Sequence, residues 1–208
     1  MTPRAPGTAP AKQYDAEYFD RWYRRSSIGV GRRQFVERKV RLALAAAEYV
    51  LGRPAHSVLD VGCGEGPWRA ILRRLRPGIS YLGIDSSAYA VARYGRTRRL
   101  RLGGLSDLAH MRLARRYDLV VCSDVLHYVS DAEARAGLAA IAPRVEGAAF
   151  IEAFTNEDEI DGDHAGLQDR SPAAYQHLFA EAGLMPVGLH VYVTREQYKE
   201  LVALERGR

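Results

Sequence analysis

From residue 57 onward, short apolar runs alternate with stretches whose apolar positions recur at helical spacing. This alternation is typical of strand–helix–strand units, whose strands pair in parallel within one sheet. The predicted strands are SVLDVG, ISYLGID, RLRLGG, YDLVVCS, GAAFIEAF and VGLHVYV. The pattern therefore predicts an α/β fold built on a mostly parallel sheet.

Helices are predicted between these strands, over residues 68–75, 87–94, 105–115 and 131–141. We expect Gly95 to end the second of them. A further helix is predicted from Ser171 to Gly183, because serine before proline is a favourable start and glycine is a common end. A last helix is expected from Arg195 onward.

The N-terminal quarter has a different pattern. Residues 1–13 are rich in Pro, Ala and Thr without periodicity, and we expect a disordered tail there. Residues 14–23 hold five aromatic side chains at partly helical spacing, and the apolar positions of residues 34–51 repeat as in a helix. We expect residues 14–208 to form one domain, with a helical cap over 14–52 and the α/β core over 57–208.

Composition and charge narrow the function classes. The 208 residues carry a net charge of +5, which would suit a nucleic-acid partner, but most of the basic residues are arginine in a sequence rich in Ala and Gly. We attribute this bias to base composition and do not expect a nucleic-acid partner. The sequence shows no membrane-spanning or signal-peptide segment, so we expect a cytoplasmic protein, monomeric or homodimeric, with Cys63 and Cys122 reduced.

Candidate chemistry is concentrated after the first two predicted strands. The first strand is followed by a turn that contains Gly62, Gly64 and Gly66, and it carries Asp60 near its end. Glycine lets the backbone approach a ligand where a Cβ would clash. The dinucleotide pattern fails because Pro67 stands where its last glycine belongs. Asp85 ends the second strand, where an acid can accept both hydroxyls of a ribose.

Together with YDLVVCSDVLHYV after the third helix, these motifs resemble the class I, Rossmann-like S-adenosylmethionine-dependent methyltransferases of the small-molecule type. The resemblance covers roughly residues 57–183 and implies a three-layer sandwich with six or seven strands and N-terminal helices. Family sheets usually end in two antiparallel strands, whereas residues 187–193 offer one. Either the seventh strand is missing or this boundary is misplaced.

The resemblance also implies roles for individual residues. S-adenosylmethionine would be the cofactor, and a small molecule would accept its methyl group at an O or N atom. The acid that often binds adenine is absent at Gly104, so the Leu105 N–H or the side chain of Asp107 would take its place. The implied cofactor-binding residues are Asp60, Gly62, Cys63, Gly64, Gly66, Asp85, Ser86, Leu105 and Ser123.

Residues near the acceptor follow from the same resemblance. The implied catalytic residues are His127, Asp124 and Tyr128, and the expected substrate-binding residues are Tyr18, Trp22, Tyr23, His127 and Tyr128. His127 either removes a proton from the acceptor or orients its loop. Close positioning alone can also drive methyl transfer, since a sulfonium is already activated.

Three further alternatives remain open at this stage. A magnesium site would use Asp124, but its partner positions read Thr155-Asn156, so we expect no metal. The acidic residues 157–169 form either a solvated loop or a surface that faces a cationic acceptor. The protein could also methylate RNA or protein, or bind S-adenosylmethionine as a catalytically silent regulator.

Overall fold

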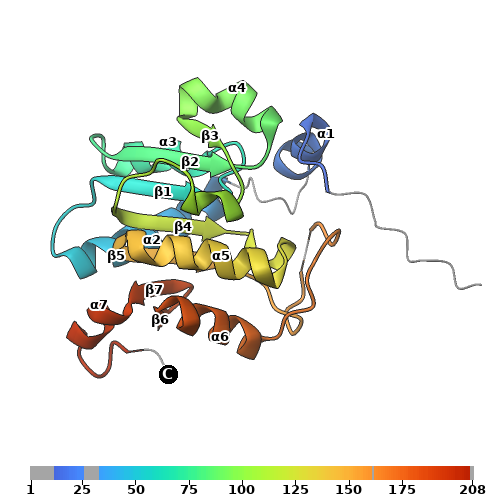
Figure 1. Ribbon diagram of the computed structural model, residues 1–208. Coiled ribbons are helices and arrows are strands. Elements are labelled where there is room, and N and C mark those ends of the chain that lie inside the picture. Colours follow the sequence, from blue (N-terminus) through green and yellow to red (C-terminus); the bar gives the residue numbers. More distant parts are fainter. Residues whose placement is uncertain (1–11, 26–32, 161, 207–208) are drawn as a thin grey trace, which may run out of the picture.

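The computed structural model describes residues 12–25, 33–160 and 162–206 (Figure 1). Within these residues, seven strands form one sheet in the order β3-β2-β1-β4-β5-β7-β6. The strands β1 to β5 are parallel, whereas β7 runs antiparallel to both of its neighbours. The predicted mostly parallel sheet is confirmed. The strands are β1 Ser57–Val61, β2 Ser80–Asp85, β3 Leu100–Leu102, β4 Tyr117–Ser123, β5 Val145–Glu152, β6 Leu184–Gly188 and β7 Val191–Thr194.

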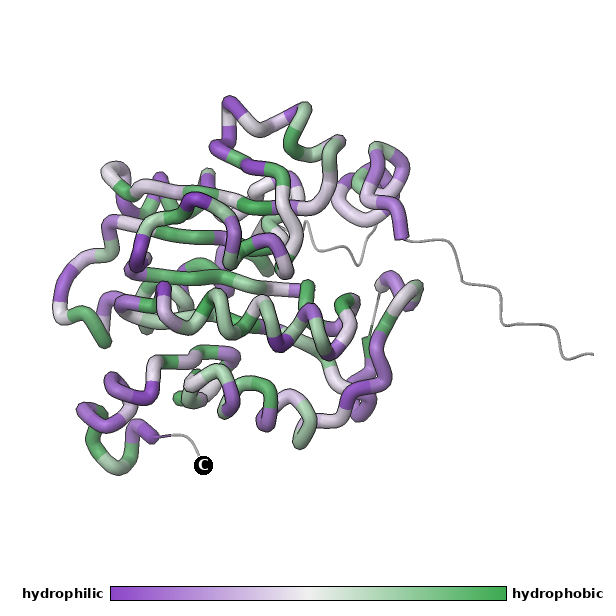
Figure 2. Tube along the Cα trace, viewed as in Figure 1, coloured by the Kyte–Doolittle hydropathy of each residue, from purple (hydrophilic) through white to green (hydrophobic). Residues whose placement is uncertain are grey.

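Helices cover both faces of the sheet, which gives the expected three layers. The helices α2 (Arg33–Leu51) and α3 (Pro67–Leu75) pack on one face, and α5 (Asp131–Ile141) and α6 (Pro172–Ala182) pack on the other. Because both faces are covered, β4 is buried along its length except at Ser123. Figure 2 shows mostly hydrophobic residues along the central strands and a mixture of hydrophobic and hydrophilic residues along the outer helices.

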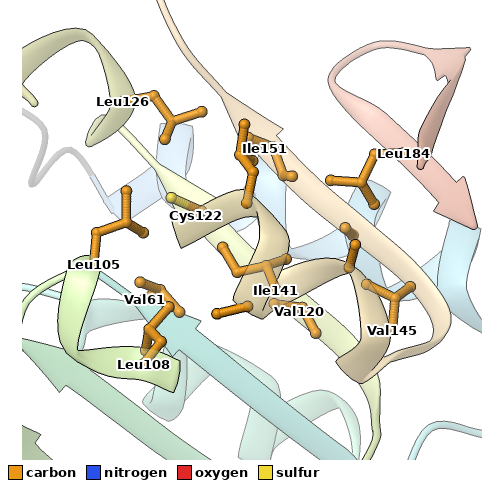
Figure 3. Packing of buried hydrophobic residues seen from close by; sticks show 14 of the residues in the cluster. Val61, Leu105, Leu108, Val120, Cys122, Leu126, Ile141, Val145, Ile151 and Leu184 are labelled. Carbon is orange, nitrogen blue, oxygen red and sulfur yellow. The ribbon is translucent and has the colours of Figure 1, made fainter. Parts of the chain in front are cut away.

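An apolar cluster on each face of the sheet holds the layers together. Figure 3 shows the cluster beneath α5, where Val61, Ile141 and Ile151 converge from β1, α5 and β5. Cys122 belongs to this cluster and Cys63 to the one on the opposite face, and both are buried free thiols, as expected. The two faces are thus filled by different helices around the same strands.

Capping side chains set the ends of several helices. The Ser171 side chain accepts a hydrogen bond from the Ala174 N–H, and Gly183 ends α6 in the left-handed conformation at φ 78°. The predicted limits of this helix are therefore confirmed. The prediction that Gly95 ends the helix after β2 is wrong. The helix α4 (Ala88–Arg98) continues past it and ends at Arg99, which has left-handed backbone.

The predicted strand over residues 187–193 is wrong and is replaced by a hairpin. The strands β6 and β7 are joined by Leu189 and His190, whose φ angles are 50° and 63°. Two positive φ angles in succession are the geometry of tight hairpin turns, which usually contain Asn or Gly. Leu-His lacks that signature, so the turn could not be read from the sequence. The helix α7 (Arg195–Glu200) follows directly.

One other helix prediction is wrong, because in place of a helix over 105–115 the structure has only the 3-10 turn η2 (Ser106–Ala109). Most of the aromatic segment 14–23 is helical, since α1 (Ala16–Phe19) continues as the π-helix η1 (Asp20–Arg25). The remaining 3-10 turns are η3 Leu126–Tyr128 and η4 Ala142–Arg144. Most of the predicted tail, residues 1–11, lies outside the described residues.

Candidate functional site

A cavity of about 390 Å³ lies at the carboxyl ends of the central strands. Its lining includes Gly62 after β1, Asp85 at the end of β2, Gly103 after β3 and Asp124 after β4. Ligands of open α/β sheets bind at this edge, where the strand order reverses. The volume is within the range of small-molecule sites.

The glycine-rich turn after β1 adopts left-handed backbone at three positions. The φ angles of Gly62, Gly64 and Gly66 are 69°, 53° and 73°, a region that glycine enters without strain. A Cβ on Gly62 would collide with Val125, and a Cβ on Gly64 would collide with the Tyr23 hydroxyl. Gly62 and Gly64 line the cavity, whereas Gly66 is the residue that precedes α3.

Asp85 presents a fixed carboxylate to this cavity. Its Oδ2 accepts a hydrogen bond from the Gly64 N–H at 2.6 Å, and its Oδ1 accepts one from the Ser87 N–H at 2.8 Å. Burial raises the pKa of this carboxyl, and the two hydrogen bonds oppose that shift. Each carboxylate oxygen can accept a second hydrogen bond, so Asp85 can still bind hydroxyl groups of a ligand. Ser86 lines the cavity beside it.

Asp60 does not line the main cavity. Its Oδ2 accepts a hydrogen bond from the Tyr81 hydroxyl at 2.6 Å, and burial raises the pKa of its carboxyl to about 7. Together with Cys63 and Ser123 it borders a small cavity of about 30 Å³. The two cavities share Gly62, so Asp60 lies next to the main cavity.

Asp124 belongs to a buried charged cluster that sequence reasoning missed in part. The Nζ of Lys39, from α2, lies 3.6 Å from Asp124 Oδ2 and also pairs with Glu152. The Ser123 hydroxyl donates to Glu152 Oε2 at 2.6 Å. Burial raises the pKa of Asp124 to about 6, and the charge of Lys39 opposes the shift. The signal for this cluster was the acid within the apolar run GAAFIEAF.

His127 and Tyr128 border different cavities. The His127 ring is buried at 2% exposure, and its Nδ1 accepts a hydrogen bond from the Phe154 N–H at 3.4 Å. Burial lowers the pKa of this imidazole to about 4, so the ring is neutral at pH 7. His127 borders a second cavity of about 270 Å³ with His164, whereas Tyr128 lines the main one.

Aromatic side chains of the N-terminal segment form one wall of the main cavity. Tyr14, Tyr18, Phe19 and Tyr23 all line it, and successive rings meet edge to face. Phe19 is also buried, at 2% exposure. Trp22 is not among the lining residues, so the structure brings Tyr18 and Tyr23, but not Trp22, to this cavity.

The segment after β3 forms another wall. Gly103, Gly104 and Leu105 line the cavity. The carboxylate of Asp107, a candidate to replace the missing acid, accepts a hydrogen bond from the Gly104 N–H at 2.7 Å and is not among the lining residues. The structure thus places Leu105, and not Asp107, against the cavity.

A buried arginine supports the segment that carries His127, and no sequence signal pointed to it. Arg170 is 3% exposed, and its guanidinium donates to the carbonyl oxygens of Leu126 at 2.8 Å and Val129 at 2.9 Å. It also bonds to Tyr175 Oη and Asp131 Oδ1. One side chain therefore fixes both ends of η3.

Among the described residues, no three His, Cys, Asp or Glu side chains come together as a metal site would require. None of the described helices combines the length and the apolar character needed to cross a bilayer.

A family model described as a methyltransferase domain matches residues 31–204. No curated protein matches the sequence significantly.

Solved structures similar to this one include several methyltransferases. Magnesium protoporphyrin IX methyltransferase from Synechocystis, with bound S-adenosylhomocysteine, is 21% identical at a TM-score of 0.60, over 86% of this chain and 92% of that one. An amino pentose methyltransferase from Micromonospora echinaspora is 18% identical at a TM-score of 0.59, over 76% of this chain and 92% of that one. A 1,6-didemethyltoxoflavin-N1-methyltransferase from Burkholderia thailandensis is 26% identical at a TM-score of 0.50, over 73% of this chain and 70% of that one.

Proposed function

The chain belongs to the methyltransferase-domain family, and from that premise we propose that it transfers the methyl group of S-adenosylmethionine to an O or N atom of a small molecule. The observation that carries this proposal is the cavity that the glycine-rich turn and the Asp85 carboxylate line together. Structurally similar methyltransferases whose descriptions name a porphyrin, an amino pentose and a didemethyltoxoflavin support a small acceptor.

The cavity residues fit this cofactor. Gly62 and Gly64 line the cavity, and neither has room for a Cβ, which would collide with Val125 or with the Tyr23 hydroxyl. Backbone without side chains at this edge allows a ligand to approach closely. Asp85 would accept hydrogen bonds from the ribose hydroxyls. Asp60 and Asp124 border the adjoining small cavity and would attract the ammonium group of the methionine part. Leu105 and the glycines before it would lie against the adenine.

When bound, S-adenosylmethionine supplies a methyl group that its sulfonium has already activated. The residues of this chain then need to position an acceptor and take up its proton. Asp124 lines the cavity, and burial raises the pKa of its carboxyl, so its carboxylate would accept that proton more readily than an ordinary aspartate. Lys39 holds the carboxylate in place through the ion pair. Buried neutral His127 orients the loop that carries Phe154.

Calorimetric titration with S-adenosylhomocysteine tests the cofactor assignment. Asp85→Asn keeps the shape of the side chain but removes its charge, and we expect at least a tenfold loss of affinity. Asp118→Asn is the matched control, because Asp118 is equally buried and also accepts two backbone hydrogen bonds, from His56 and Ser57, without lining the cavity. Equal affinities in the two variants would show that Asp85 does not bind the cofactor.

The acceptor class needs a separate assay. Purified protein is incubated with methyl-labelled S-adenosylmethionine and with small hydroxyl compounds, small amines, total RNA and unfolded protein. We expect label in small molecules alone. Labelling confined to RNA or protein would overturn the small-molecule assignment, and binding of S-adenosylhomocysteine without labelling of any acceptor would favour a regulator.

A further inference from the structure

The ammonium group of Lys12 is enclosed by aromatic rings at the main cavity. Its Nζ lies 3.4 Å from the centroid of the Tyr128 ring, 5.4 Å from that of Tyr14 and 5.5 Å from that of Tyr18. The Asp163 carboxylate is 2.7 Å away and completes the enclosure. We call these four residues the cation cage. Three of them, Tyr14, Tyr18 and Tyr128, also line the cavity, as Lys12 does.

The cage comes from segments that are far apart in the sequence. Tyr14 and Tyr18 precede the core, Tyr128 follows β4, and Asp163 belongs to the acidic loop after β5. The Tyr128 hydroxyl donates to the Asp163 carbonyl oxygen at 2.8 Å, which connects the ring and the carboxylate directly. Gln168 N–H donates to the His127 carbonyl oxygen at 2.9 Å, which fixes the same loop beside η3. The Tyr128 ring and the loop that carries Asp163 are therefore held in place by these contacts as well as by Lys12.

The contacts of Lys12 suit an ammonium group, although they satisfy few of its donors. Cation–π attraction acts at all three rings. Within the described part of the chain, Nζ is buried without a hydrogen bond of good geometry, and its close polar contact is the ion pair with Asp163. Burial lowers the pKa of Lys12, against the opposing effect of Asp163. Rings and one carboxylate can hold an alkylammonium without needing hydrogen bonds from all of its N–H groups.

We propose that the cation cage is a subsite for an alkylammonium group of the acceptor, and that Lys12 occupies it as an internal mimic until the acceptor replaces it. The inference rests on the proposed function and narrows the acceptor to amine-bearing small molecules. The acidic residues around Asp163 would attract such a cation toward the cavity. An acceptor without a cationic group that displaced Lys12 would break three cation–π contacts and one ion pair and would replace none of them.

The test measures binding of n-butylammonium, which reproduces the lysine side chain, by NMR titration of the full-length protein. Lys12→Ala truncates the side chain and so vacates the cage, and we expect at least tenfold tighter binding of the probe than in the wild type. Lys199→Ala is the matched control, because Lys199 is an exposed lysine on α7, and it should bind the probe as the wild type does. Adding Asp163→Asn or Tyr128→Leu to Lys12→Ala should remove the gain.

Several results would overturn the proposal. Equal binding of the probe by the wild type and Lys12→Ala would show that Lys12 is a structural tether. Equal binding of uncharged butan-1-ol and n-butylammonium by Lys12→Ala would show an apolar pocket without selection for charge. Titration of the same proteins with S-adenosylhomocysteine separates the two levels of inference. If the Lys12 variant binds S-adenosylhomocysteine but not n-butylammonium, the cation cage alone is refuted. If the wild type does not bind S-adenosylhomocysteine, the proposed function is refuted.

Discussion

Replacing Arg170 by methionine should strongly destabilise the protein. The change removes the donors for the carbonyl oxygens of Leu126 and Val129, and Leu126 is fully buried. Each buried acceptor left without a partner costs about 1–3 kcal/mol. The contact with Asp131 adds little, because that side chain is 77% exposed. Methionine fills much of the same volume, so we expect a total loss of about 4 kcal/mol, a large part of the stability of a typical domain.

Urea unfolding followed by circular dichroism measures this loss, with the slope m checked for constancy. The control is Arg135→Met, since Arg135 pairs with Glu181 at the surface with its side chain 54% exposed, and we expect a change within about 0.5 kcal/mol. Arg170→Lys keeps the charge but cannot reach all four partners, so an intermediate loss is expected. A loss below about 1 kcal/mol for Arg170→Met, at unchanged m, would refute the reasoning.

Two further changes test the core and the buried acid. Gly137→Ala should destabilise the protein by about 2 kcal/mol in urea unfolding despite the better helix propensity of alanine, because the new Cβ would collide with Leu105, and a stabilised variant would contradict the packing described for α5. The folded state of the wild type holds the Asp60 proton more tightly than the unfolded state does, since burial raises its pKa to about 7, so this group lowers stability as pH rises from about 4 to 7. In Asp60→Asn the amide oxygen can still accept the hydrogen bond from Tyr81. The free energy of unfolding of this variant, relative to that of the wild type, should therefore rise by about 2 kcal/mol between pH 5 and pH 8. The same relative free energy at both pH values would show that the carboxyl titrates normally.

The parts of the fold that follow from local patterns could be predicted from the sequence. The strands β1, β2 and β4 are largely apolar, and the motif residues Asp85 and Gly62 lie at strand ends where topology brings them together. The hairpin turn at Leu189 could not be predicted, because its positive φ depends on the pairing of the two strands and not on the residue type.

Side-chain partners distant in sequence were also beyond prediction. Lys39 and Glu152 are 113 residues apart, and Arg170 and Leu126 are 44 residues apart. A single sequence shows that each polar residue exists but not which buried group it satisfies. The cation cage likewise depends on a loop that brings Asp163 to Tyr128. The acids in that loop suggested either a solvated loop or a surface that faces a cationic acceptor, but not that Asp163 meets the Tyr128 ring.

The hairpin of β6 and β7 at one edge of the sheet also affects how the protein behaves at high concentration. An unpaired edge strand is a template onto which another chain can add by backbone hydrogen bonding, which leads to aggregation. One edge of this sheet is β3, which is only three residues long, and the other is β6, which contains Pro186. Proline lacks the N–H that a new strand would require. Both margins of the sheet therefore discourage edge-to-edge association between copies.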